Sequence, residues 1–156
     1  MIIPTLTALA TWHSVHTSCI PSHPTPVITI HGTTDAVVSY NGGVPANSES
    51  LADIITFWTN YNKTIGLPII SNLPDIDSSD GSTVELSIYD NGENCTSVEH
   101  YKVIGGDHDW PGISNEFNIN QNSETKTFFT KYDIRGNLDI KMSYEIWNFL
   151  NNVNTL

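Results

Sequence analysis

Apolar and polar positions alternate with two different periods along the chain. Residues 26–30 (PVITI) form a short, almost continuous apolar run rich in β-branched side chains, which is typical of a strand buried on both faces of a sheet. Residues 83–89 (TVELSIY) and 98–104 (VEHYKVI) alternate as half-buried strands do, and residues 90–92 (DNG) between them favour a turn. We therefore expect a buried strand, followed later in the chain by a hairpin or near-hairpin.

Two other segments follow the helical period. The first should begin after Ser48, which we expect to be its N-cap, and its apolar face consists of Leu51, Ile54, Ile55, Trp58 and Tyr61. The second should follow Asp139, again an expected cap, and its apolar stripe consists of Met142, Ile146, Phe149 and Leu150. Strand-like and helix-like pieces thus alternate without an internal repeat, which predicts an α/β domain.

The connecting segments differ in character. Residues 63–82 hold two prolines and a run of Asp and Ser, so we expect a surface connection there. Residues 105–112 (GGDHDWPG) form a loop with glycines around a single histidine, the most distinctive local sequence of the chain. Residues 113–137 are rich in Asn and look irregular. With 156 residues, the chain should form a single domain, residues 1–156, with a lead-in over residues 1–24.

Composition narrows the class of protein. Hydrophobic residues make up 38% of the chain and charged residues only 15%, so the chain can bury a core and does not resemble a disordered protein. The formal net charge of -11 argues against nucleic acid and anionic membrane surfaces as partners. No apolar run approaches the roughly 20 residues of a membrane-spanning helix. Residues 1–10 lack the basic start of a secretory signal, and we interpret them as part of the fold, beginning inside a longer gene.

Two polar residues follow predicted strands at the same end. Asp35 lies in residues 31–35 (HGTTD), directly after the first strand, and His108 lies in the glycine-flanked loop after the last strand. Functional groups gather at the carboxyl ends of strands in open α/β sheets. A carboxylate bonded to one imidazole nitrogen fixes the tautomer and leaves the other nitrogen free to take a proton. We therefore expect Asp35 to orient His108.

Simpler interpretations exist for each residue alone. Asp35 could cap a turn, and His108 could be an ordinary loop residue, since each motif is common by chance. Asp107 and Asp109 are rival acids, but sequence neighbours of a histidine seldom point back at its ring. The order of acid first and histidine later, with a helix and strands between them, is that of α/β-hydrolases.

Several segments together carry a family resemblance. They are residues 27–43 (VITIHGTTDAVVSYNGG), Trp58, residues 103–112 (VIGGDHDWPG) and residues 139–150 (DIKMSYEIWNFL). In this order they resemble the C-terminal half of the polyhydroxybutyrate depolymerase-like esterases, which are similar to feruloyl and acetylxylan esterases. The resemblance covers the chain from about Cys19 onward.

The resemblance implies an α/β fold that is the C-terminal part of an α/β-hydrolase sheet with flanking helices. It also implies a secreted serine esterase that needs no cofactor. Asp35 would be the triad acid, His108 the triad histidine, and Trp110 a residue lining the substrate cleft. Substrate choice stays open among polyhydroxyalkanoates, feruloylated or acetylated polysaccharides and small esters.

The chain departs from the family at the nucleophile. A serine esterase needs its serine on a sharp G-x-S-x-G turn, and no such motif is present. Residues 112–116 (GISNE) lack the second glycine and follow the histidine, and Ser14 has no flanking glycines. We therefore expect a truncated enzyme that is inactive alone. The strand at residues 27–30 would lack neighbours, so the chain should bind the missing half or associate with itself.

Two alternatives belong to other classes of function. His13, His16, Cys19 and His23 could bind zinc, although two prolines interrupt the segment and the spacing matches no familiar finger. The chain could instead be a pseudoenzyme or a non-catalytic module that binds polymer or carbohydrate through Trp58, Trp110, Tyr40 and Tyr101, of which Trp58 and Tyr101 fit a core better. Cys19 and Cys95 could form one disulfide or remain two thiols.

Overall fold

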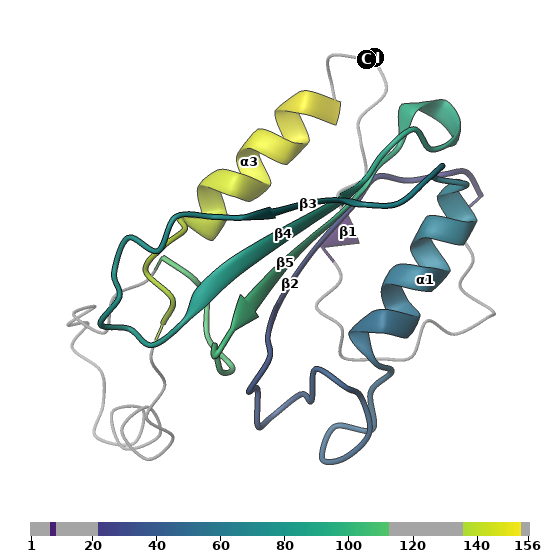
Figure 1. Cartoon of the computed structure of the whole chain (residues 1–156). Coiled ribbons are helices and arrows are strands. Elements are labelled where there is room, and N and C mark those ends of the chain that lie inside the picture. The colour runs from purple at the N-terminus through teal and green to yellow at the C-terminus, as the bar shows by residue number, and fades with distance from the viewer. Residues whose placement is uncertain (1–6, 9–21, 113–135, 154–156) are drawn as a thin grey trace, which may run out of the picture.

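A computed structural model of the chain describes residues 7–8, 22–112 and 136–153. Within these residues the sheet has five strands, of which β1 is only two residues long, and two helices accompany it (Figure 1). The elements are β1 (Thr7–Ala8), β2 (Val27–Gly32), α1 (Leu51–Asn62), β3 (Ile69–Asn72), β4 (Thr83–Tyr89), the 3₁₀ turn η1 (Glu93–Cys95), β5 (Val98–Ile104) and α3 (Met142–Val153).

The sheet is mixed, with strand order β1-β2-β5-β4-β3. The first three strands in this order are parallel, and β5, β4 and β3 are antiparallel neighbours. Thr29 on β2 lies opposite His100 on β5, so β2 and β5 end side by side at Gly32 and Val103. The predicted strands and the hairpin of β4 and β5 are confirmed, and the chain has a small α/β fold.

Alternate residues of β2 face different helices, which lie on opposite sides of the sheet (Figure 1). Ile28 and Ile30 belong to the core beneath α3, together with Met142 and Phe149. Val27 instead contacts the α1 side, in a second cluster with Ile54, Trp58 and Val98. Strand β2 is therefore buried on both faces, as its continuous apolar run predicts.

Helix α1 begins two residues later than predicted. Its N-cap is Ser50, whose side-chain oxygen accepts a hydrogen bond from the Asp53 N–H at 3.1 Å. Ser48 is buried instead, and its backbone N–H and carbonyl are bonded to Gly43. The prediction of Ser48 as the N-cap is wrong because the backbone N–H and carbonyl of Ser48 are hydrogen-bonded to Gly43 instead.

The connection predicted for residues 63–82 contains a strand. Ile69 to Asn72 form β3, which pairs antiparallel with β4 at the edge of the sheet. All four side chains of β3 are exposed, including those of Ile69 and Ile70. A strand with neither face buried shows no alternation of apolar and polar residues, so the sequence pattern could not indicate it.

Asp139 does not cap the last helix. Its Oδ1 accepts hydrogen bonds from the backbone N–H groups of Ile76 and Asp77 at 2.7 and 3.1 Å, and its Oδ2 accepts one from the Asn137 amide. Helix α3 begins at Met142. The predicted helix is confirmed, but the predicted role of Asp139 is wrong, because its carboxylate joins the loop before β4 to the segment before α3.

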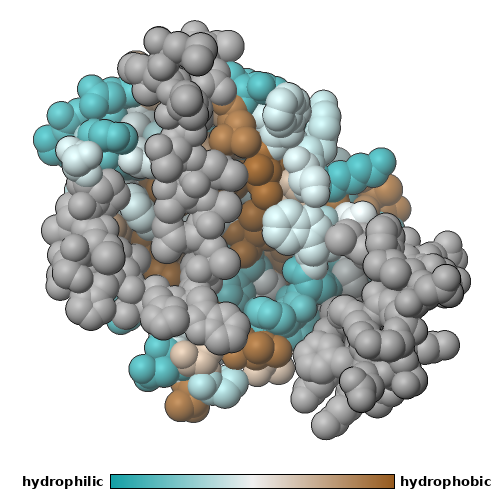
Figure 2. Space-filling view, turned by 180° about the vertical axis from the view of Figure 1, so that it is seen from behind, coloured by the Kyte–Doolittle hydropathy of each residue, from teal (hydrophilic) through white to brown (hydrophobic). Residues whose placement is uncertain are grey.

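The outer edge of β2 is largely open in the part of the chain that the structure describes. Strand β1 pairs only with Val27 and Ile28. Seen from behind, the molecule exposes a band of apolar residues, coloured brown, beside hydrophilic and near-neutral residues (Figure 2). Neither of the two described helices combines the length and apolarity needed to cross a bilayer.

Candidate active site

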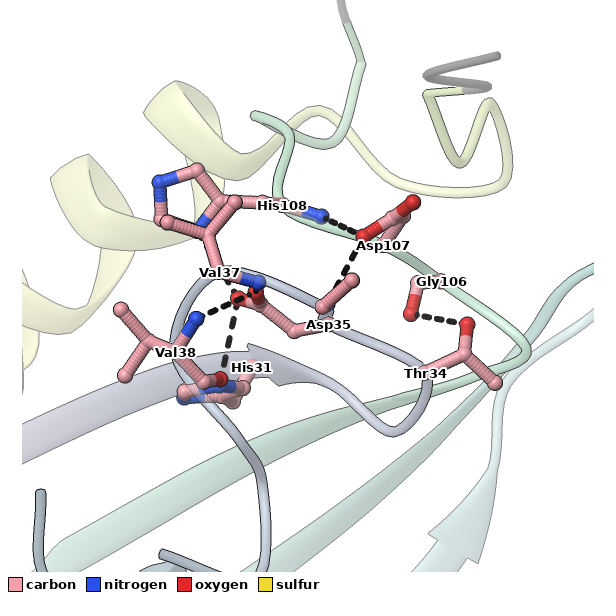
Figure 3. A network of polar contacts seen from close by, with 9 residues as sticks. His31, Thr34, Asp35, Val37, Val38, Gly106, Asp107 and His108 are labelled. Atoms are coloured by element: carbon pink, nitrogen blue, oxygen red, sulfur yellow. Dashed lines mark hydrogen bonds and ion pairs between the residues drawn. The ribbon is translucent and has the colours of Figure 1, made fainter. Parts of the chain in front are cut away.

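The loops that follow β2 and β5 are fastened to each other. The hydroxyl of Thr34 donates to the carbonyl of Gly106 at 2.8 Å, and the N–H of Thr33 donates to the carbonyl of Val103 at 2.9 Å (Figure 3). A side chain at Gly32 would collide with the carbonyl of Gly106, so only glycine allows the two loops to lie this close. The two loops therefore hold their polar side chains at a fixed separation.

Asp35 and His108 meet at this junction. Oδ2 of Asp35 lies 2.9 Å from Nδ1 of His108, across the tips of two adjacent parallel strands (Figure 3). The Asp35 side chain is 5% exposed and the His108 side chain 44%. The structure thus brings together the two residues that the sequence singles out, with the acid buried and the imidazole accessible.

Four donors surround the Asp35 carboxylate. Oδ1 accepts from the N–H groups of Val37 and Val38, both at 2.8 Å, and Oδ2 lies near the rings of His108 and His31. Burial opposes ionisation of Asp35, but the hydrogen bonds from His31, Val38, His108 and Val37 outweigh it and hold the pKa of this carboxyl well below its usual value. Asp35 is therefore a carboxylate at neutral pH.

The charge of Asp35 determines the tautomer of His108. A carboxylate can only accept a hydrogen bond, so Nδ1 of His108 carries the proton in the 2.9 Å contact. In the neutral ring, Nε2 then has a free lone pair. This arrangement can accept a proton from a hydroxyl placed near Nε2, which is what the acid and histidine of a serine triad do together.

Asp107 and Asp109, the rival acids, have other contacts. Oδ1 of Asp107 accepts from the N–H groups of Ala36 and His108 at 3.2 and 2.8 Å. Oδ2 of Asp109 is buried and has no hydrogen-bond partner among the described residues. Burial raises the pKa of Asp109 to about 7, and the negative charges of Asp107 and Asp35 add to this effect. The geometry therefore favours Asp35 as the acid that orients His108.

Replacing Asp109 by Asn should stabilise the protein in alkaline solution. The folded-state pKa of about 7 exceeds the ordinary value of 3.8, so the contribution of Asp109 to stability is fully present below pH 3.8 and is lost as the pH rises through about 7. At about pH 8 we expect Asp109→Asn to raise the free energy of unfolding by about 1 kcal/mol, a value reduced by solvent screening.

Urea denaturation of both proteins at about pH 8 and about pH 4.5 would measure this difference. At the lower pH the carboxyl is protonated in the folded state, and the pH is only slightly above the ordinary value of 3.8, so the gain from Asp109→Asn should be a small fraction of the gain at about pH 8. An equal gain at both pH values would contradict the assignment of the effect to the charge of Asp109.

Trp110 follows His108 by two residues and lies on the surface. Its side chain is 45% exposed, and its indole N–H donates to the hydroxyl of Ser143 on α3 at 3.3 Å. Tyr144 and Trp147, also on α3, are exposed as well. The sequence pattern gave no signal for these two aromatic residues, because a helical period assigns them only to the solvent face.

Two histidines near the site, His31 and His100, were not singled out from the sequence, and Tyr40 was considered only as part of an aromatic platform. His31 is buried beside Asp35, with Nε2 3.3 Å from Oδ2 of Asp35. The hydroxyl of Tyr40 lies 2.9 Å from Nε2 of His100, and burial lowers the pKa of His100 to about 4, so this ring is neutral. The sequence signal that could have identified His31 is its position as a histidine within an otherwise apolar strand.

The alternative sites have less support. His13, His16 and Cys19 lie outside the described residues, and His23 is exposed with its ring near the carbonyl of Pro24. Within the described ranges, no group of three or more His, Cys, Asp or Glu side chains could hold a metal ion. Cys95 is exposed and has no disulfide partner within the described residues, and Cys19 lies outside them.

The proposed aromatic platform is dispersed. Trp58 and Tyr101 are core residues on opposite faces of the sheet, and the hydroxyl of Tyr40 contacts His100. Ser14 and Ser114, the serines considered as nucleophiles, lie outside the described residues.

The comparisons with known proteins add no identification. A scan against protein-family models finds no match for this chain, and a search of the curated proteins finds none. The esterase resemblance therefore stays a prediction that depends on the residues themselves.

Proposed function

We propose that this chain supplies the acid and the histidine of a serine carboxylic-ester hydrolase. The observation that supports this most is the 2.9 Å contact between Oδ2 of Asp35 and Nδ1 of His108. It joins a buried, ionised carboxylate to an accessible imidazole, and both follow adjacent parallel strands. The His108 side chain is 44% exposed, as a histidine that must reach a substrate has to be.

In the proposed reaction, Nε2 of His108 takes the proton of a serine hydroxyl while the serine oxygen attacks the ester carbonyl carbon. The imidazolium, stabilised by Asp35, then returns this proton to the departing alcohol, and an acyl-enzyme forms. Water attacks the acyl-enzyme in the second half, again losing its proton to His108. Serine receives that proton when the carboxylic acid leaves, so the histidine is regenerated.

The serine and the oxyanion-binding N–H groups would come from another segment or chain. The sequence has no G-x-S-x-G motif. Among the described residues, the outer edge of β2 has a partner strand only at Val27 and Ile28, so Thr29 to Gly32 leave backbone groups available for pairing. A nucleophile-bearing strand added beyond β2, or association of two copies, would cover this edge.

Trp110 is proposed to line the substrate side of the site. Its exposed ring lies two residues beyond His108, on the side of α3. A flat aromatic surface suits the uncharged backbone of an ester polymer, and the resemblance implies such substrates and a secreted enzyme. The excess of acidic residues also fits an uncharged substrate better than a polyanion.

Ester hydrolysis by the chain, with and without the coding sequence upstream of Met1, tests the proposal. The 156 residues alone should release p-nitrophenol from a short-chain ester at the background rate. The extended protein should contain a G-x-S-x-G serine, hydrolyse the ester and react with a fluorophosphonate at that serine. Serine-dependent turnover by the chain alone would contradict the proposal that the nucleophilic serine comes from outside these 156 residues. An extended protein that adsorbs to insoluble polymer without hydrolysing it would favour a binding module.

A further inference from the structure

The hydrogen-bond geometry of His31 establishes which of its nitrogens carries a proton. His31 is buried on β2, and its Nε2 lies 2.8 Å from the carbonyl oxygen of Val38. A carbonyl oxygen can only accept, so Nε2 must carry a hydrogen. The same nitrogen lies 3.3 Å from Oδ2 of Asp35, which is ionised and also accepts only. Nε2–H therefore bonds to the Val38 carbonyl, and Oδ2 of Asp35 is a second, longer contact of the same nitrogen.

We propose that His31 is a positioning residue that donates from Nε2 to Oδ2 of Asp35 and thereby fixes the oxygen that His108 uses. Two histidine rings then donate to one carboxylate oxygen, while backbone N–H groups of Val37 and Val38 occupy the other (Figure 3). The role of His31 in catalysis depends on the proposed esterase function. Its effect on Asp35 does not.

Because four donors contact the Asp35 carboxylate, rotating this carboxyl group would break its contacts. Turning the group away from His31 would break the bonds to Val37 and Val38 as well, because all are made by one planar carboxylate. The carbonyl of Val38 holds the ring of His31 in the orientation that donates. His31 thus couples the end of β2 to the loop that carries Asp35 and limits the positions available to the His108 ring.

Several titratable groups surround this pair and must be considered in any titration. They are Tyr40, His100, Lys102, Asp107, His108 and Asp109. His100 is the useful comparison, because it is a buried histidine on the same face of the neighbouring strand and is bonded to Tyr40 and Thr29.

The test is an NMR titration of the isolated chain, in which the Asp35 carboxyl carbon and the ring nitrogens of His31 and His108 are followed. In the wild-type protein, His31 should be the Nε2–H tautomer. His31→Phe keeps a ring but has no donor, so Asp35 should titrate about one pH unit higher and the low-field Nδ1–H signal of His108 should broaden. His31→Gln retains an N–H donor and should restore both.

His100→Gln is the matched control and should leave the titration of Asp35 unchanged. The proposal is overturned if Asp35 titrates identically in His31→Phe and wild type, or if His100→Gln shifts it equally. An Nδ1–H tautomer of His31 in the wild-type protein would also overturn it, even if His31→Phe failed to fold. These measurements use no ester, so failure of the esterase proposal would leave their outcome unaffected.

Discussion

Asp35→Asn is expected to lower kcat for ester hydrolysis about 10⁴-fold in the enzyme completed by its serine, the size of effect that this substitution has in serine proteases. An amide at this position can donate its own hydrogen to Nδ1 of His108. The imidazole would then carry its proton on Nε2, where it cannot accept one from the serine hydroxyl. Stopped-flow or plate assays with p-nitrophenyl butyrate would measure the loss.

KM should change much less than kcat, because Asp35 is buried and does not reach the substrate side of the imidazole. Asp75→Asn, which removes an exposed carboxylate far along the chain from Asp35, is the matched control and should retain wild-type kcat. A variant at Asp35 that retains more than about a tenth of wild-type turnover would refute the assignment of Asp35 as the triad acid.

Asp139→Ala is expected to lower the free energy of unfolding by about 3 kcal/mol. The substitution leaves the N–H groups of Ile76 and Asp77 without their acceptor and removes a bond from the buried amide of Asn137. A polar group left unsatisfied in a buried position costs about 1 to 3 kcal/mol, and both Asn137 and Asp139 are buried. Equilibrium denaturation in urea, with the transition followed by tryptophan fluorescence, would measure the change.

Asp139→Asn is the conservative comparison, because an amide oxygen can still accept from Ile76 and Asp77. It should cost about 1 kcal/mol, less than half the effect of alanine. If Asp139→Ala were as stable as wild type, the carboxylate would not be fastening the loop before β4 to the segment before α3.

Some parts of the fold were predictable because they depend on local patterns. The apolar run at residues 27–30, the alternation at 83–89 and 98–104, and the helical periods of α1 and α3 are visible without tertiary contacts. The positions of Asp35 and His108 just beyond strand ends were also visible. Their proximity was inferred from the general behaviour of parallel strands, and in the structure Oδ2 of Asp35 lies 2.9 Å from Nδ1 of His108.

Other features could not be read from the sequence because distant residues determine them. Strand β3 forms only because β4 offers an open edge, and its own side chains carry no buried pattern. Asp139 resembles a helix cap in sequence, but its Oδ1 accepts hydrogen bonds from residues more than 60 positions earlier. The bridge of Ser48 to Gly43 likewise moves the cap of α1 to Ser50.

The sequence by itself determined the alternation of strands and helices, the acidic character of the chain and the order of one aspartate and one histidine at strand ends. Only the tertiary structure decided which carboxylate faces the His108 imidazole and which hydrogen bonds keep Asp35 ionised. It also decided that Nε2 of His31 lies near the same Asp35 oxygen that His108 contacts. The physical reason is that periodicity records which face of an element is buried, whereas these contacts depend on strand register and loop paths. Strand register and loop paths are in turn set by contacts between residues about 70 positions apart in the chain.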